Sequence, residues 1–258
     1  MRFEYFDMLC GDPLYLEGVG HLRSPKLKEI CPNSHVGYKM YNLYLSFLSW
    51  DKEHLLKYDE FMKFRGASKL RKDALNVFDA VTLLKQTREL CRTVLSFFIV
   101  EEPFWDETKR RFLLLSREEE IPKVVGAVNR DNFEDVRRLI LHLNYIGLDK
   151  DEAPVSHSDE ATKNLWERAQ QHLKEQAKLY TPKDRPEYHL SNIISKLCAA
   201  HPSYNLLNVY DLTIFQLYDA FFQLGFIRSS DLNERIFSNH GGKKFKFEDW
   251  LKPIFKKV

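Results

Sequence analysis

The strongest helical pattern in the chain lies between Ala74 and Leu95. Apolar side chains recur there every three or four residues and keep one helix face apolar over about six turns. The same spacing predicts further helices over residues 33–47, 55–64, 131–147, 190–200, 212–224, 231–238 and 247–255. Gly225 is expected to end the helix that follows Asp211, because glycine is common just beyond helix C-termini.

Two regions of the N-terminal half change to the two-residue period of β-strands. Residues 9–30 contain two short alternating runs around Glu17 and Gly18, which predicts a hairpin. The apolar runs at residues 95–100 and 110–115 predict a second hairpin, with a turn near Pro103. The predicted fold class is therefore mainly α with one or two small β-hairpins.

Two punctuated segments divide the chain. Residues 149–160 are acidic, residues 181–188 contain two prolines, and both are typical of linkers. The residues between them predict a mostly polar helix. We therefore expect an N-terminal α-rich lobe with hairpins at residues 1–148, linkers and a bridging helix at 149–188, and a C-terminal helical lobe at 189–258.

Composition narrows the class of protein. The chain has 258 residues, of which 44% are hydrophobic and 29% charged, so it is expected to fold rather than to be disordered. The net charge of +2 is too small to indicate a nucleic-acid partner. The first residues lack the apolar core of a signal peptide, and the apolar run at residues 95–100 is too short to cross a bilayer. We expect a soluble, intracellular protein that does not contact membranes.

No motif for catalysis or for cofactor binding is found in the sequence. The G-x-S-x-G elbow that carries a serine nucleophile is absent. Gly241-Gly-Lys-Lys244 lacks the spacing of a phosphate-binding loop. Cys198 and His201 form only half of a zinc site, which needs four ligands. We therefore predict no catalytic residue, no metal and no cofactor, and we leave open an enzyme whose site is assembled from residues distant in sequence.

Candidate partner-binding residues lie on the bridging helix and in the C-terminal lobe, because large aromatic and apolar side chains dominate protein interfaces. They are Leu165, Trp166, Ala169, Leu173, Tyr204, Tyr210, Phe215, Tyr218 and Phe222. Most of the C-terminal aromatics are also expected to build the core of their lobe. As an alternative, Lys243, Lys244 and Lys246 could meet nucleic-acid phosphates beside interleaved aromatics, although a solvated basic face is the favoured interpretation.

About a quarter of the chain resembles a known family. The matching marks are Asn129–Phe133, Ala200–Asn205, Asp211–Ile214 and Gln216–Tyr218. With these marks the chain resembles tail assembly chaperone-like proteins encoded in the tail gene cluster of Gram-positive long-tailed phages and prophages, although it is longer than the short chaperones of that kind. The resemblance implies a nonenzymatic protein of the host bacterial cytoplasm that binds the tape-measure protein and tail-tube subunits. Self-association is a further expectation, and nucleic acid is disfavoured as a partner.

Overall fold

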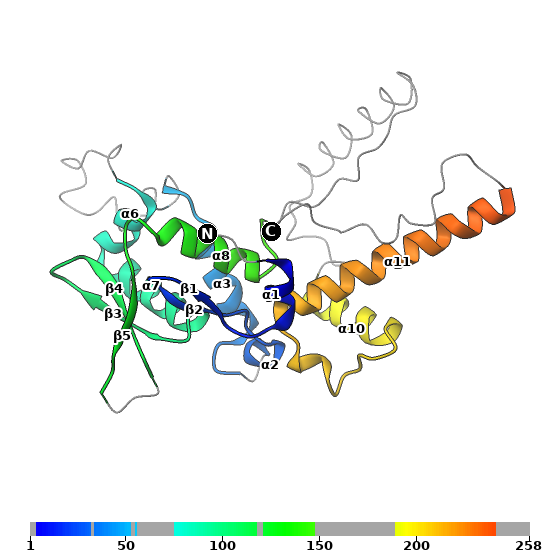
Figure 1. The fold of residues 1–258 in the computed structure, drawn as a ribbon, viewed down its shortest axis with the longest axis horizontal. Helices are drawn as coiled ribbons and strands as arrows, with labels where there is room; N and C mark the ends of the chain where they lie inside the picture. Colours follow the sequence, from blue (N-terminus) through cyan, green and yellow to red (C-terminus); the bar gives the residue numbers. More distant parts are fainter. Residues whose placement is uncertain are drawn as a thin grey trace, which may run out of the picture. The chain divides into compact units, whose positions relative to one another are not determined.

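The computed structural model describes residues 4–31, 34–52, 55, 75–117, 121–147 and 189–240. The fold is mainly α-helical with two small antiparallel sheets, as predicted (Figure 1). Two compact units are present: Met1–Leu148 with Tyr210–Gln216, and Asp149–Val209 with Leu217–Lys257. The predicted bridging helix, the helix at 247–255 and most of the helix at 55–64 lie outside the described residues.

The first unit contains six described helices and both sheets. The helices are α1 (Tyr5–Cys10), α2 (Leu27–Ile30), α3 (Gly37–Ser49), α6 (Val77–Leu83), α7 (Lys85–Phe98) and α8 (Phe133–Leu143). The strands are β1 (Leu14–Leu16), β2 (Gly20–Leu22), β3 (Glu102–Asp106), β4 (Arg111–Leu115) and β5 (Val124–Val128). In the second unit α10 spans Leu190–Ala200, and α11 (Ile214–His240) begins in the first unit and continues into the second.

The predicted N-terminal hairpin is confirmed by the pairing of β1 with β2, in which Leu14 lies opposite Leu22. Its turn contains Gly18, whose φ of 75° is a left-handed conformation that glycine adopts without strain. The second hairpin also forms, between β3 and β4, but its first strand is not at residues 95–100 as predicted. Those residues continue α7 as far as Phe98, because a helix there buries both Leu95 and Phe98 completely.

The long helix predicted from Ala74 to Leu95 is two helices. The backbone becomes extended at Leu84, with φ −95° and ψ 140°, which separates α6 from α7. Asn76 begins α6, since its side chain accepts a hydrogen bond from the Asp79 amide and the Asp79 side chain accepts one from the Asn76 amide. The Thr87 hydroxyl donates to the carbonyl of Val81 at 2.6 Å across the break. Apolar periodicity alone could not reveal this interruption, because apolar residues recur at helical spacing both before and after Leu84.

The core of the first unit is aromatic where α6 and α8 meet the three-stranded sheet. The ring centroid of Phe78 in α6 lies 5.3 Å from that of Phe133 in α8. It lies 6.3 Å from the ring centroid of Phe112 in β4, with the two rings nearly perpendicular. Trp105 of β3 packs on Phe112 at 4.9 Å. In Figure 1 the helices of this unit lie on one side of the β3–β4–β5 sheet. The face of the sheet that carries Phe112 and Leu114 of β4 is fully buried.

Residues 210–216 complete the first unit rather than the C-terminal lobe in which we expected them. The Leu27 amide donates to the Leu212 carbonyl at 2.9 Å, and the Ile214 amide donates to the Pro25 carbonyl at 2.9 Å. Asp211 does not cap the following helix; it pairs with Lys28 at 2.8 Å. This hydrogen bond raises the pKa of Lys28 and lowers the pKa of Asp211.

Helix α11 differs from the prediction at both of its ends. It begins with a capping box in which the Thr213 hydroxyl accepts from the Gln216 amide and the Gln216 side chain accepts from the Thr213 amide. It does not end at Gly225 but continues to His240, so the predicted separate helix at 231–238 is part of it. Gly225 is exposed and helical, and a single glycine reduces helix stability by only about 1 kcal/mol.

Candidate functional site

Several sequence-predicted binding residues lie outside the described part of the chain. These are Leu165, Trp166, Ala169 and Leu173 of the bridging segment and the alternative nucleic-acid contacts Lys243, Lys244 and Lys246. Both groups therefore stay predictions.

The five C-terminal aromatics do not form one surface. Phe215 is fully buried in the first unit, where its ring contacts Tyr5 at 6.0 Å and Tyr145 at 5.3 Å, so its assignment to a partner surface is corrected to a core role. Tyr218 and Phe222 are half-buried on α11 and stack on each other at 6.4 Å. The two remaining tyrosines, Tyr204 and Tyr210, flank a loop between α10 and α11.

That loop presents two leucines to solvent. Leu206 is 62% exposed and Leu207 is 92% exposed, although both are large apolar side chains. Between them and α10, the half-buried Tyr204 ring packs on the His201 ring at 4.5 Å. After them, Val209 is fully buried and anchors the end of the loop. We call residues 203–209 the leucine loop.

Side chains of asparagine hold the leucine loop in a defined conformation. The Asn208 side chain accepts from the Asn205 amide at 2.9 Å and donates to the Ser203 carbonyl at 2.9 Å. The Asn205 side chain accepts from the Leu207 amide at 2.8 Å. Asparagine commonly stabilises turns in this way, by satisfying backbone groups two or three residues away. Because the turn is preorganised, a partner would meet the exposed leucines at a reduced cost in conformational entropy.

The loop and its flanks carry no charged side chain. Residues 197–210 contain no Asp, Glu, Lys or Arg, whereas fourteen residues would hold about four at the 29% frequency of the chain. Depletion of charge together with tyrosines and exposed apolar side chains is typical of the centre of a protein interface. The arrangement can bind an apolar surface.

Sequence reasoning missed Leu206 and Leu207 because they belong to neither a helical nor a strand period. The signal that could have found them is local: two adjacent leucines bracketed by Asn205 and Asn208 inside an uncharged run. Asparagines at those positions predict a turn, and the side chains within a surface turn are commonly exposed to solvent.

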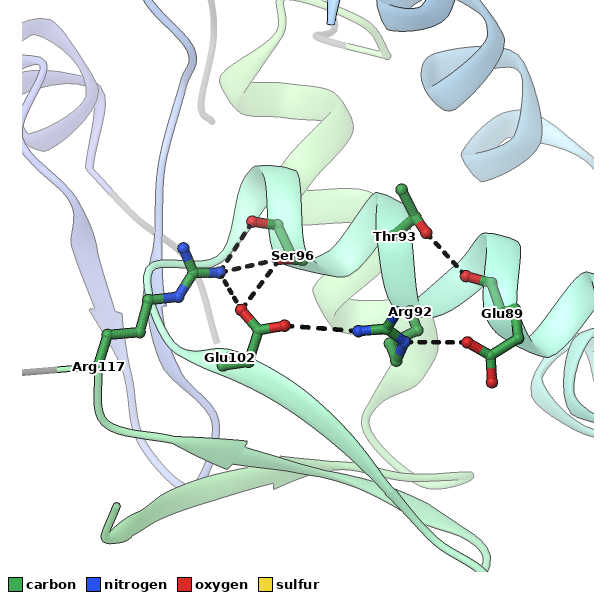
Figure 2. Close-up of polar contacts among 6 residues, drawn as sticks. All are labelled: Glu89, Arg92, Thr93, Ser96, Glu102 and Arg117. Atoms are coloured by element: carbon green, nitrogen blue, oxygen red, sulfur yellow. Dashed lines mark hydrogen bonds and ion pairs between the residues drawn. The ribbon is translucent and has the colours of Figure 1, made fainter. Parts of the chain in front are cut away.

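Glu102 forms the centre of a polar cluster in the first unit, shown in Figure 2. Its carboxylate lies 2.7 Å from Arg117 and 3.5 Å from Arg92, and Arg117 also donates to the Ser96 hydroxyl at 2.8 Å. Arg92 in turn pairs with Glu89 one turn earlier on α7. These groups satisfy one another, so the cluster fastens the end of β4 and the start of β3 to α7.

Glu101 and His21 form a second polar pair, which fastens the N-terminal hairpin. Glu101 is buried, and its carboxylate accepts from the His21 backbone amide at 2.9 Å and lies 2.7 Å from the His21 Nδ1 atom. Both contacts join β2 to the turn between α7 and β3. In the described residues no group of three or more His, Cys, Asp or Glu side chains could hold a metal ion.

Helices that could cross a membrane are not found within the described ranges. Neither a curated protein nor a solved structure matches the chain. Residues 181–255, which include the leucine loop, match the family model described as the YomV second domain, a phage-associated family. This similarity supports a phage protein, and it covers the segment in which the structure exposes its leucines.

Proposed function

We propose that this chain is a nonenzymatic phage tail assembly chaperone or scaffold that binds the tape-measure protein and tail-tube subunits in the host cytoplasm. The observation that supports the proposal is the preorganised, uncharged leucine loop within the segment that is similar to a phage-associated domain.

A tape-measure protein is a long helical chain whose apolar positions lack cover until the tail tube surrounds it. Leu206 and Leu207 could each bury an apolar side chain against such a helix, for about 1.5–3 kcal/mol apiece. A contact of that size is weak for a single copy. Many copies bound along one elongated partner would nevertheless cover it, and each copy could leave as the tube subunits arrive.

The proposal is tested by co-expressing the full chain with the tape-measure protein encoded beside it and measuring how much of each is recovered together. The double substitution Leu206→Ser with Leu207→Ser is expected to weaken the complex at least tenfold, because it removes the apolar contact without changing charge. The matched control is Leu232→Ser on α11, where a leucine of similar exposure, 57%, lies outside the loop. This control should leave binding within about twofold of the original.

Two results would contradict the proposal. One is equal binding by the loop variant and the control, which would place the contact elsewhere. The other is recovery of nucleic acid alone, with binding that falls steeply as salt rises, since apolar contacts are little affected by salt and phosphate contacts strongly so. Replacement of Lys243, Lys244 and Lys246 by Gln should have no effect on tape-measure binding.

A further inference from the structure

His201 joins the end of α10 to the start of the leucine loop. It is the C-cap of the helix, and its backbone amide donates to the Leu197 carbonyl at 2.8 Å. In the other direction, its ring Nδ1 atom accepts a hydrogen bond from the Ser203 amide at 3.2 Å. The ring also packs on the Tyr204 ring, with centroids 4.5 Å apart. One side chain thus contacts the first two residues of the loop.

The contact between His201 and Ser203 requires a neutral imidazole. A backbone amide can only donate, so Nδ1 must supply a lone pair and the ring proton must lie on Nε2. An imidazolium carries a proton on both nitrogens and cannot accept this bond. Histidine is the side chain that ordinarily changes charge between about pH 5 and 8. The hydrogen bond is therefore made by the neutral ring and is lost when the ring gains a proton as the pH falls.

Ser203 is the first member of a series of hydrogen bonds that orders the leucine loop. Its amide donates to His201, and its carbonyl accepts from the Asn208 side chain at 2.9 Å. The Asn208 side chain also accepts from the Asn205 amide, and the Asn205 side chain accepts from the Leu207 amide. Hydrogen bonds connected in this way strengthen one another. Loss of the bond to His201 should therefore reduce the order of the turn that presents the leucines.

Few charged groups surround His201 in the described part of the chain. Helix α10 carries one, the exposed Lys196, and residues 197–210 carry none. Two weakly acidic groups are closer: Tyr204 stacks on the ring, and Cys198 lies one turn earlier on α10. Burial raises the pKa of the Cys198 thiol, which is therefore uncharged at neutral pH. Neither α10 nor the loop has a carboxylate that could hold an imidazolium where the neutral ring lies.

The end of α10 offers the protonated ring a different position. The last carbonyls of a helix lack intrahelical donors and carry a partial negative charge, which stabilises a cation at the C-terminus. His201 directly follows Ala200, the last residue of α10. The acidic side chains of α11 in the second unit are Asp219, Asp231 and Glu234, and the described contacts of the His201 ring are with Ser203 and Tyr204 instead. Protonation therefore favours rotation of the ring away from the loop and toward the helix.

We propose that His201 makes the leucine loop sensitive to pH. The neutral ring holds the loop in the conformation that presents Leu206 and Leu207, and protonation releases it. One hydrogen bond of ordinary strength changes the ratio of ordered to open loop by about threefold or more. Partner binding should consequently be stronger near pH 7.5 than near pH 5.5. This consequence for binding rests on the proposed function, whereas the change in the loop itself does not.

Hydrogen exchange of the full chain, with millisecond labelling at pH 7.5 and pH 5.5, tests the proposal without a partner. Exchange rates are divided by the intrinsic rate at each pH, so that only the protection of the amides is compared. Peptides that cover residues 203–209 should be at least threefold less protected at pH 5.5 than at pH 7.5. Peptides from α7, which is buried in the first unit, give the internal control and should be equally protected at both.

Two substitutions separate the role of the acceptor from that of the titrating group. In His201→Asn, the side-chain oxygen can still accept from the amide two residues later but does not titrate, so the loop should stay protected at both pH values. In His201→Leu no acceptor remains, so the loop should be weakly protected at both. The matched control is His189→Asn at the exposed N-cap of α10, which should keep the pH dependence of the original chain.

Equal loop protection at the two pH values in the original chain would overturn the proposal, as would a pH dependence that persists in His201→Asn. The latter variant keeps the test decisive even if His201→Leu fails to fold, which circular dichroism reports. Co-purification with the tape-measure protein at both pH values then measures the effect on binding, which should weaken at least threefold at pH 5.5 and stay constant in His201→Asn. Absence of binding at pH 7.5 would contradict the proposed function and leave the exchange result standing.

Discussion

Gly126 is a position where a single methyl group decides packing. It lies on the covered face of β5, and a Cβ atom placed there would come within 2.2 Å of the Val19 carbonyl oxygen in the hairpin turn. The Ala127 amide donates to the Gly18 carbonyl at 2.9 Å at the same contact, so the turn cannot withdraw without losing a hydrogen bond. Gly126→Ala should therefore lower the free energy of unfolding by about 1–3 kcal/mol. Urea unfolding followed by tryptophan fluorescence measures the change, and an unchanged midpoint would refute the close approach.

The cysteines should differ widely in reactivity, because the thiolate is the reactive form and must also be reached. Cys10 is exposed, whereas Cys91 is fully buried in α7 and burial raises the pKa of its thiol. At pH 8, iodoacetamide should modify Cys10 within minutes and leave Cys91 intact until the chain is unfolded in urea. Peptide mapping by mass spectrometry reads the two sites separately. Comparable labelling of both in the native chain would show that α7 is not packed as described.

Helix α11 allows a test in which the sign of the effect separates two conformations. If Gly225 lies within a continuous helix, Gly225→Ala should raise stability by about 0.5–1 kcal/mol, because alanine favours helix and the added Cβ meets no neighbour. If the helix instead ended at Gly225 in a left-handed cap, as the sequence led us to expect, the same substitution would lower stability. Urea unfolding followed by far-ultraviolet circular dichroism distinguishes the two signs.

The type of an element was predictable from the sequence where a local pattern alone determines it. The boundaries of elements were not predictable where tertiary packing opposes the local pattern. The first hairpin follows from its turn residues, and the helix at 190–200 follows from apolar spacing. The β-like run at 95–100 became helix as far as Phe98, where Leu95 and Phe98 are fully buried, whereas Ile99 is extended and forms a β-bridge with Leu22. The leucine loop was missed for the opposite reason, since Leu206 and Leu207 are mostly exposed and their positions are not set by the burial that produces a helical or strand period.

The first unit is completed by residues that follow it by more than sixty positions in the sequence, and no local pattern could have shown this. Residues 210–216 bring Phe215 into its core, and the Phe215 amide donates to the buried Ser24 hydroxyl at 3.3 Å. Gln216 reaches back to the Leu9 carbonyl at 2.8 Å. The core of the N-terminal unit is thus built by residues 210–216 as well as by the lobe expected at residues 1–148.

Phe215→Ala should therefore destabilise the N-terminal unit, although the residue belongs by sequence to the C-terminal part. Removal of a fully buried phenylalanine costs about 3–5 kcal/mol, and part of that cost is the cavity left beside Tyr5 and Tyr145. Hydrogen exchange at the Leu27 amide, which donates to Leu212, should accelerate by at least tenfold. The exposed Phe6 of α1 gives the control, since Phe6→Ala should leave that exchange rate nearly unchanged. Equal rates in the two variants would mean that residues 210–216 do not close the first unit.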